Sequence, residues 1–275
     1  FVFFGTDEFA VIVLEELKKG GFTPTLIVTA PDKRKGRGLM LTPTPVKLWA
    51  QKNGIQFLQS QKLDDATSHK LQATSYDLFI VTSYGKILPK KILDIPKHGT
   101  LNVHPSLLPL FRGPSPIHSQ ILENTRIVGV TIMLMDEKID HGPILAQQVL
   151  GFKIYDLRFK DLRDQLAHLG GRLLAETIPN WVAGNIDAKD QDHARATYTK
   201  IIKKEDGLVD IKNDDPEMLY RKFRAYKLWP NIFFLSKNKR VKITDAEFVN
   251  GEFRIKKVIP EGRKEITYKN FLKYI

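Results

Sequence analysis

The chain has 275 residues, of which 42% are hydrophobic and 27% are charged, and its formal net charge is +12. It contains no cysteine, which excludes a disulfide framework, a thiolate zinc site and a cysteine nucleophile, and which indicates a reducing cytoplasm. No apolar run approaches the ~20 residues that a membrane-spanning helix needs, so we expect no membrane partner.

The positive charge is concentrated near the end of the chain. Residues 195–275 contain 20 Lys and Arg and 11 Asp and Glu, which gives a net charge of +9. Residues 1–194 contain 23 Lys and Arg and 20 Asp and Glu, which gives a net charge of +3. A basic tail on a nearly neutral body indicates a polyanionic partner, most often nucleic acid. The alternative is a lysine-rich surface that is merely solvated.

The first part of the chain predicts an open, mostly parallel α/β sheet, because apolar strand-like runs alternate with helical spacing. Strands are expected at 1–4, 23–29, 56–58 and 77–82, and helices are expected up to Lys19 and over 45–53, 64–74 and 116–123. The first turn, Gly5-Thr6-Asp7, carries one glycine and does not match GxGxxG, so no nicotinamide or flavin cofactor is predicted.

Residues 31–42, PDKRKGRGLMLT, are predicted to form a basic loop with two glycines. Its cations can donate to phosphates, but it lacks the Gly-Lys-Ser/Thr ending of a phosphate-cradling NTPase loop. It is therefore either a phosphate-contacting segment or an ordinary mobile surface loop.

The stretch from Gly99 to Ile117, GTLNVHPSLLPLFRGPSPI, begins as a buried strand and continues as a Pro-rich loop. Asn102 and His104 are two residues apart, so their side chains leave the strand on the same face. Taken alone, the pattern is equally consistent with a strand that runs into a turn whose polar residues only satisfy the backbone.

Asp140 lies in the polar turn 135–143, between predicted strands at 128–134 and 144–149, where it could reach His104. An amide can donate to an oxygen that becomes negative, a neutral histidine can accept a proton, and an aspartate can fix the tautomer of that histidine. These groups suit acyl-type transfer without a covalent enzyme intermediate, because Ser106 lacks a nucleophile-elbow context. The nearby histidines match no HExxH spacing, so no metal is predicted.

The rest of the chain predicts a second, smaller domain. Residues 157–182 are expected to be mostly helical, with interruptions at Gly170-Gly171 and Pro179. A helix over 216–225 and alternating runs at 232–235, 240–248 and 253–258 predict a small β-barrel or meander. The predicted boundaries are 1–183 for the first domain, 184–203 for a linker and 204–275 for the tail domain.

The stretch LNVHPSLLPLFRGPSPI, with MDEKIDHGPIL at 135–145, resembles the signature of the folate-dependent formyltransferases, whose Asn, His and Asp match Asn102, His104 and Asp140. Further similarities span nearly the whole chain: FFGTDEFA, APDKRKGRG, TPTPVK, SYGKILP, RGPSPI, YTKIIKKEDGLVD and RKFRAYKLWP. The flanking similarities favour the branch of this family that formylates methionine on initiator tRNA.

The resemblance implies an α/β enzyme with a Rossmann-like open sheet, followed by a small β-barrel of the oligonucleotide-binding (OB) type that grips the tRNA acceptor arm. The enzyme would transfer the formyl group of 10-formyltetrahydrofolate to the amino group of methionine on initiator methionyl-tRNA, for translation initiation. Asn102 would hold the formyl oxygen, His104 would assist the attack of the amine, and Asp140 would support His104. We expect a monomer.

Binding residues are also implied by the resemblance. Phe9 would contact the methionine side chain, and the tRNA acceptor end would meet Lys33, Arg34, Lys35 and Arg37. The folate would be held by the loops 84–89 and 136–140 and by the turn after His104: Tyr84, Gly85, Ile87, Leu88, Pro89, Ser106, Leu107, Leu108, Pro109 and Asp136.

Two other functions stay open on the sequence alone. One is a formyltransferase that acts on a small amine, such as an amino-sugar nucleotide or glycinamide ribonucleotide. The other is a non-catalytic RNA-binding protein on an α/β scaffold. The basic loop and tail favour tRNA, and competition between aminoacylated tRNA and small amines would distinguish the substrates.

Overall fold

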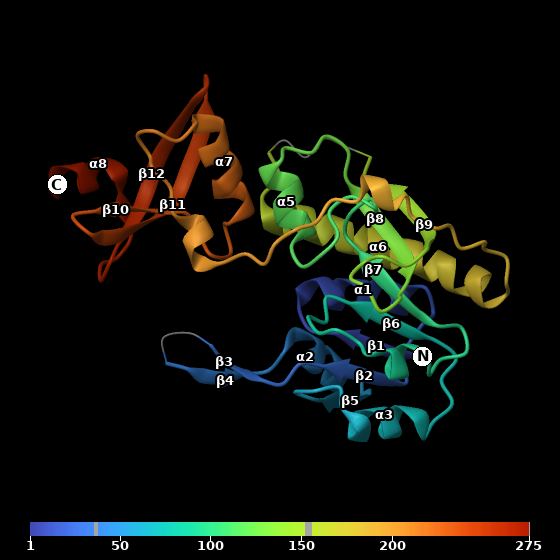
Figure 1. Ribbon diagram of the computed structural model, residues 1–275. Helices are drawn as coiled ribbons and strands as arrows, with labels where there is room; N and C mark the ends of the chain where they lie inside the picture. The colour runs from blue at the N-terminus through green and yellow to red at the C-terminus, as the bar shows by residue number, and fades with distance from the viewer. Residues whose placement is uncertain (36–37, 152–155, 275) are drawn as a thin grey trace. The chain divides into compact units, whose positions relative to one another are not determined.

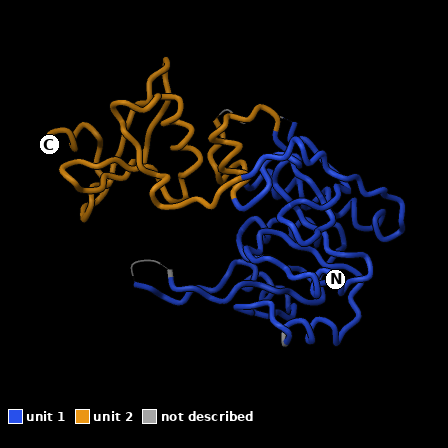
Figure 2. The backbone as a smooth tube through the Cα atoms, viewed as in Figure 1, with its two compact units in different colours: residues 1–114, 128–151, 163–198 blue, residues 115–127, 152–162, 199–275 orange. Residues whose placement is uncertain are grey.

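The protein is described by a computed structural model that covers residues 1–35, 38–151 and 156–274. The chain divides into two compact units (Figure 2). Unit 1 contains residues 1–114, 128–151 and 163–198, and unit 2 contains the described residues of 115–127, 152–162 and 199–275.

Unit 1 is built on a seven-stranded sheet in the order β5-β2-β1-β6-β7-β8-β9 (Figure 1). The strands are β1 (Val2–Gly5), β2 (Leu26–Thr29), β5 (Gln56–Gln59), β6 (Phe79–Thr82), β7 (Thr100–His104), β8 (Gly129–Leu134) and β9 (Ile144–Val149). The strands from β5 to β7 are parallel, whereas β8 runs antiparallel to both β7 and β9. The mostly parallel sheet predicted from the sequence is confirmed.

The helices of unit 1 begin at the caps that the sequence supplies. Asp7 accepts hydrogen bonds from the backbone N–H groups of Phe9 and Ala10, and Thr44 caps the second helix, which begins at Pro45. The helices are α1 (Glu8–Lys19), α2 (Pro45–Lys52), α3 (Asp65–Gln72), α4 (Lys90–Leu93) and α6 (Phe159–Val182), whose first turn belongs to unit 2. Every residue of β1, β2, β6 and β7 is buried, as expected for strands covered on both faces.

The predicted interruptions of the long helix are wrong, because α6 runs without a break through Gly170, Gly171 and Pro179. A Cβ at Gly170 would lie 2.6 Å from Cγ1 of Val103, and one at Gly171 would lie 2.5 Å from Cβ of Glu16. The two glycines therefore allow α6 to lie close against β7 and α1, and they do not end the helix.

The basic segment 31–42 is a hairpin, where a loop was predicted. Strands β3 (Lys33–Lys35) and β4 (Met40–Thr42) pair antiparallel and project away from the main sheet (Figure 1). The apolar side chains near its tip, Leu39, Met40 and Leu41, are exposed. Arg37 lies outside the described residues.

Unit 2 combines helices with a four-stranded antiparallel meander. Its elements are α5 (Pro116–Leu122), α7 (Pro216–Ala225), β10 (Phe233–Ser236), β11 (Lys239–Val249), β12 (Glu252–Pro260), β13 (Ile266–Thr267) and α8 (Tyr268–Phe271). Asn250 and Gly251, both with positive φ, turn β11 into β12, as predicted for a hairpin. The small antiparallel β-domain predicted after the sheet is confirmed.

Residues 184–198, placed in the predicted linker, belong to unit 1. Lys189 exchanges two backbone hydrogen bonds with Ile144 of β9. Further on, Thr197 pairs with Pro109 and Arg112 of the Pro-rich loop. Unit 2 also takes in two segments from within the predicted first domain, so the boundaries at 183 and 204 stay predictions.

In the described part of the chain, no helix has the length and apolar character needed to cross a membrane.

Candidate active site

Asn102 and His104 lie on the same face of β7, near its carboxyl end. Both side chains are buried, with 9% and 4% of the residue exposed. The strand holds them rigidly, because β7 pairs with β6 on one side and with β8 on the other. The i, i+2 spacing therefore places an amide and an imidazole next to each other, as the sequence predicts.

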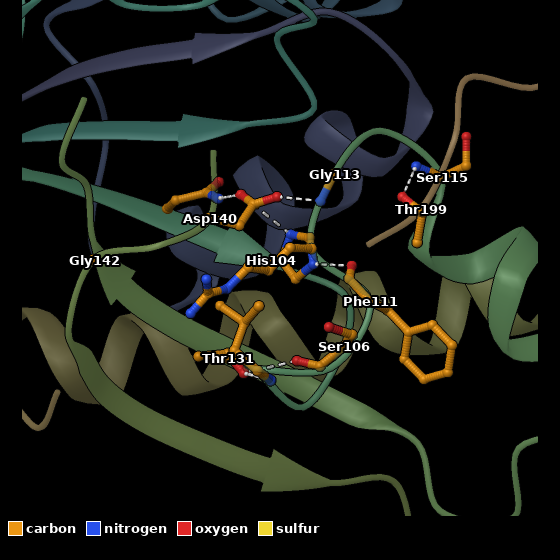
Figure 3. A network of polar contacts seen from close by, with 12 residues as sticks. His104, Ser106, Phe111, Gly113, Ser115, Thr131, Asp140, Gly142 and Thr199 are labelled. Atoms are coloured by element: carbon orange, nitrogen blue, oxygen red, sulfur yellow. Dashed lines mark hydrogen bonds and ion pairs between the residues drawn. The ribbon is translucent and has the colours of Figure 1, made fainter. Parts of the chain in front are cut away.

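Asp140 reaches this pair from the loop that follows β8. Its Oδ1 accepts a hydrogen bond from Asn102 Nδ2 at 3.3 Å and lies 3.6 Å from Nδ1 of His104. Its Oδ2 accepts a hydrogen bond from the backbone N–H of Gly113 at 2.7 Å (Figure 3). The structure thus brings the three predicted catalytic residues together, and their roles in catalysis stay predictions.

The surroundings of His104 fix which ring nitrogen carries a proton. Nε2 lies 3.0 Å from the carbonyl oxygen of Phe111 (Figure 3), which can only accept a hydrogen bond. Nε2 is therefore protonated, and in the neutral ring the lone pair on Nδ1 faces Asp140. If Nδ1 takes up a proton, the resulting imidazolium has an oxygen near each nitrogen.

These positions define what the site can do chemically. The amide of Asn102 uses one N–H on Asp140 and has a second to offer to a carbonyl oxygen. Nδ1 of His104 can take a proton from an attacking amine, and Asp140 balances the charge that results. Among the residues that the structure describes, no three His, Asp or Glu side chains form a metal site. The free N–H of Asn102 and the Nδ1 of His104 suit acyl transfer to an amine.

The turn after His104 is held by a set of internal hydrogen bonds. The Ser106 hydroxyl donates to the carbonyl of Leu110 at 2.6 Å. The Thr131 hydroxyl donates to the carbonyl of Ser106 at 2.7 Å (Figure 3). Thr131 also accepts from the N–H of Leu108, whose peptide bond to Pro109 is cis. Ser106 and Leu108 are buried, while Leu107 and Pro109 are partly exposed. The folate-binding role of this turn stays a prediction.

The predicted folate loop 84–89 has both buried and exposed residues. Tyr84 and Leu88 are buried in the cluster that contains Phe4 and Leu93, whereas Ile87 is 72% exposed. Gly85 has a φ of 75°, which glycine adopts without strain, and Pro89 caps α4. The buried Tyr84 hydroxyl has no hydrogen-bond partner among the described residues, and burial raises its pKa to about 12.

Two hollows border these loops. The first, of about 550 Å³, is lined by the start of β7, the end of β8 and the loop that carries Asp136: Lys90, Leu93, Asp94, Pro96, Lys97, Gly99, Thr100, Leu134, Met135, Asp136, Glu137, Lys138 and His141. The second, of about 610 Å³, lies at the carboxyl ends of β1, β2 and β6 and is lined by Thr6, Asp7, Ala30, Pro31, Asp32, Lys33, Gln61, Ser83, Tyr84, Gly85 and Lys86. Ligands of open α/β sheets bind outside the carboxyl ends of the parallel strands, where the second hollow lies.

The second hollow contains charged groups with altered proton affinity. Burial, and to a lesser extent the nearby charge of Lys33, lowers the pKa of Lys86. Burial raises the pKa of Asp7, although the hydroxyl of Ser83 donates to its carboxylate at 2.6 Å and partly offsets this effect. The hollow therefore presents both a cationic and a carboxyl group to a ligand.

Comparison with known proteins identifies the family. Residues 1–178 match the family model described as formyl transferase, and residues 201–264 match the formyl transferase C-terminal domain. The chain belongs to the formyl transferase family. A protein named methionyl-tRNA formyltransferase from Chloroflexus aggregans is 40% identical to it, over 89% of this chain and 79% of the relative. One of the same name from Bacillus subtilis is also 40% identical, over 88% of this chain and 76% of the relative. Within the formyl transferases, the chain belongs with these enzymes.

Solved formyl transferase structures share the fold at lower identity. A sugar N-formyltransferase from Shewanella matches with a TM-score of 0.67 and 19% identity, over 90% of this chain and 98% of that chain. An N-formyltransferase from Helicobacter canadensis, in complex with folinic acid and dTDP-3-aminofucose, matches with a TM-score of 0.64 and 18% identity, over 97% of both chains.

The residues predicted to meet the tRNA lie on two elements of this formyl transferase. Phe9, in the first turn of α1, is buried. Lys33 and Arg34 are exposed on the projecting hairpin, where Lys35 ends β3. These placements leave the substrate roles as predictions.

The sequence does not predict the groups that orient His104 and Asp140. They are the carbonyl of Phe111, the N–H of Gly113 and the side chain of Gln191, whose amide nitrogen donates to the backbone carbonyl of Asp140 at 3.0 Å. Backbone groups leave no signal in a sequence, and Gln191 lies in a segment without hydrophobic periodicity.

Proposed function

We propose that this formyl transferase moves the formyl group of 10-formyltetrahydrofolate to the α-amino group of methionine on initiator methionyl-tRNA. The observation that carries the proposal is the convergence of Asn102, His104 and Asp140 in a chain that is 40% identical to methionyl-tRNA formyltransferases. The net charge of +9 on residues 195–275 supports a nucleic-acid substrate over a small amine. Action as a monomer in the cytoplasm stays a prediction.

Each catalytic residue has one task in the proposed reaction. Asn102 donates its free N–H to the formyl oxygen and stabilises the negative charge that develops there in the transition state. His104 takes the proton of the attacking amine on Nδ1, while Phe111 keeps the other ring nitrogen protonated. Asp140, anchored by Gly113, faces the imidazolium that forms. When the bond from the formyl carbon to the folate nitrogen breaks, that nitrogen takes the proton back from His104, which leaves the histidine neutral and releases tetrahydrofolate.

The residues around the first hollow fit a folate. Its volume of about 550 Å³ lies within the range of small-molecule sites, and its lining combines apolar Leu93 and Met135 with the carboxylate of Asp136. The unpartnered hydroxyl of Tyr84 lies in the core cluster against which Met135 packs. Leu93, Met135 and Asp136 would hold the pterin ring system, and the bound folate would supply the formyl group; Tyr84 itself lines the second hollow.

Transfer assays with the purified full chain test this function. The wild type should formylate initiator methionyl-tRNA in preference to an amino-sugar nucleotide or glycinamide ribonucleotide offered in competition. Asn102→Ala should lower kcat by about 10²- to 10³-fold, and His104→Ala by about 10²- to 10⁴-fold. The affinity for tRNA should stay within about twofold of wild type, because both side chains are buried and offer little surface to a nucleic acid.

Arg172→Ala, on the exposed face of α6, is the control and should match wild type. Formylation of the small amine alone would contradict the substrate, and unchanged kcat in both site variants would contradict the catalytic assignment.

A further inference from the structure

Arg112 is a buried arginine between two residues that contact His104 and Asp140. Phe111 before it accepts from His104, and Gly113 after it donates to Asp140. Only 1% of Arg112 is exposed. Within residues 1–35, 38–151 and 156–274, its guanidinium donates to the side chains of Gln191, Tyr198 and His193, none of which is a carboxylate. A buried cation beside a catalytic loop therefore has neutral partners only, and their identity indicates its role.

The principal partner of Arg112 is Gln191. Nε and Nη2 of Arg112 donate to Gln191 Oε1 at 3.1 and 2.6 Å. Nη2 also donates to Nδ1 of His193 at 2.8 Å, and Nη1 donates to the Tyr198 hydroxyl at 3.3 Å. The planar fork of the guanidinium thus fixes both the position and the orientation of the glutamine amide.

Gln191 passes this orientation on to the loop that carries Asp140. With Oε1 facing the guanidinium, its Nε2 donates to the backbone carbonyls of Asp140 at 3.0 Å and Gly142 at 2.7 Å. The reverse orientation of the amide would set N–H groups against N–H groups. Gln191 is 5% exposed, so water does not compete for these bonds.

The backbone of Asp140 requires such support. Its φ of 48° lies in the left-handed region, which costs energy for a residue other than glycine. Gln191 holds its carbonyl while Gly113 holds its carboxylate, so both ends of Asp140 are fixed. Arg112 acts on the backbone of Asp140 through the side-chain amide of Gln191. Its positive charge therefore does not pair with the Asp140 carboxylate that faces His104.

We propose that Arg112 and Gln191 are positioning residues for formyl transfer, which rests on the proposed function. They form a brace that holds the Asp140 carboxylate against His104 and Asn102. His193 extends the brace, because its ring stacks on His141 with the centroids 4.0 Å apart, and His141 contacts Asp136 of the predicted folate loop at 2.6 Å.

A double-mutant cycle on the full chain tests the brace. Gln191→Glu keeps the size of the side chain and an acceptor for Arg112, but it turns an acceptor toward the carbonyls of Asp140 and Gly142. We expect kcat to fall by about 10- to 100-fold, since small misplacement of a catalytic group has this effect, with KM for both substrates changed less than about threefold. Arg112→Lys, which keeps the charge but loses the fork, should act in the same direction.

The Asp140→Asn background isolates the mechanism. The Asp140→Asn protein has no carboxylate for Gln191 to position. In that protein, Gln191→Glu should lower kcat by less than about twofold. Gln147→Glu is the matched control: Gln147 Nε2 also faces a backbone carbonyl, that of Leu108, and it does not contact Asp140. Its effect, whatever the size, should be equal in both backgrounds.

An equal effect of Gln191→Glu in both backgrounds, or no effect in the wild type, would overturn the proposal. The ¹⁵N chemical shifts of the His104 imidazole give a readout that does not depend on turnover. Gln191→Glu should move them in the direction that Asp140→Asn does, and unmoved shifts in a folded Gln191→Glu protein also overturn it. A wild type without transfer to methionyl-tRNA would instead contradict the proposed function.

Discussion

His104 and His118 show how their surroundings give two histidines of one chain different properties. His104 has a carbonyl at one ring nitrogen and the Asp140 carboxylate near the other. His118 in unit 2 stacks on Phe159, with ring centroids 4.1 Å apart. Burial lowers the pKa of His118 from 6.5 to about 4. His118 therefore stays neutral at physiological pH and acts as a packing residue.

The lowered pKa of His118 predicts an acid-sensitive stability. The unfolded chain takes up a proton there near pH 6.5, but the folded chain does so only near pH 4. Stability that is present above pH 6.5 is therefore lost as the pH falls toward 4, by up to about 3 kcal/mol. His118→Phe, which can keep the stacking, should reduce this loss.

Denaturant unfolding of both proteins between pH 4 and pH 7, followed by tryptophan fluorescence, measures the difference. Carboxylates elsewhere titrate equally in both proteins and cancel in the comparison. Parallel curves for the two proteins would show that His118 does not titrate in this way.

At the scale of elements, α6 shows where packing overrides local propensity. Glycine disfavours helices by up to about 1 kcal/mol relative to alanine, so a Gly-Gly pair predicts a break. In the structure the pair is needed because Val103 and Glu16 occupy the space that Cβ atoms would fill. Such a requirement depends on strands and helices far away in the sequence, and local patterns do not contain it.

Gly170→Ala is therefore expected to destabilise the protein although it raises helix propensity. Its Cβ would meet Val103 at 2.6 Å and Val130 at 3.1 Å, and relieving this overlap should cost about 1–3 kcal/mol of unfolding free energy. Thermal and denaturant unfolding provide the measurement. Arg172→Ala, exposed in the same helix, should change stability by less than about 0.5 kcal/mol. A stabilised Gly170→Ala would mean that the helix does not lie this close to β7.

Elements with strong local sequence signals are the ones that the sequence predicts correctly. Buried strands such as β1 and β6 are short apolar runs, and α7 begins after an aspartate cap with proline first, so both leave local signals. The β3–β4 hairpin has three consecutive charged residues in β3 and no apolar–polar alternation, so its sequence resembles that of a loop. Strand spacing is fixed and therefore predicts that Asn102 and His104 share a face, whereas Gln191 acts through two hydrogen bonds that span 51 and 49 residues of sequence.

At the scale of the whole molecule, charge and chemistry are separated along the chain. The proposed catalytic residues lie in unit 1, and residues 195–275 carry a net +9 of the total +12. Phosphate contacts release counterions, so binding that depends on such a tail weakens steeply with salt. A tail that contacts about six phosphates should lose about 10³-fold in tRNA affinity between ~50 and ~200 mM salt.

Titration of labelled initiator tRNA at several salt concentrations measures this slope. Binding of the folate, which offers far fewer phosphate-like charges, serves as the control and should change much less. A flat slope for tRNA would contradict the nucleic-acid role of the basic tail.

The pairing of residues 184–198 with unit 1 has a consequence for exchanging domains between relatives. A tail grafted after residue 183 replaces Gln191, and with it the group that holds the Asp140 carbonyl. The recipient would keep Asn102, His104 and Asp140, but a residue of the grafted tail would stand where Gln191 donates to the Asp140 backbone carbonyl. A junction placed after Tyr198 transfers the tail and leaves the native support with the catalytic residues. Chimeras that differ only in this junction would therefore differ in turnover while sharing both their catalytic residues and their tail.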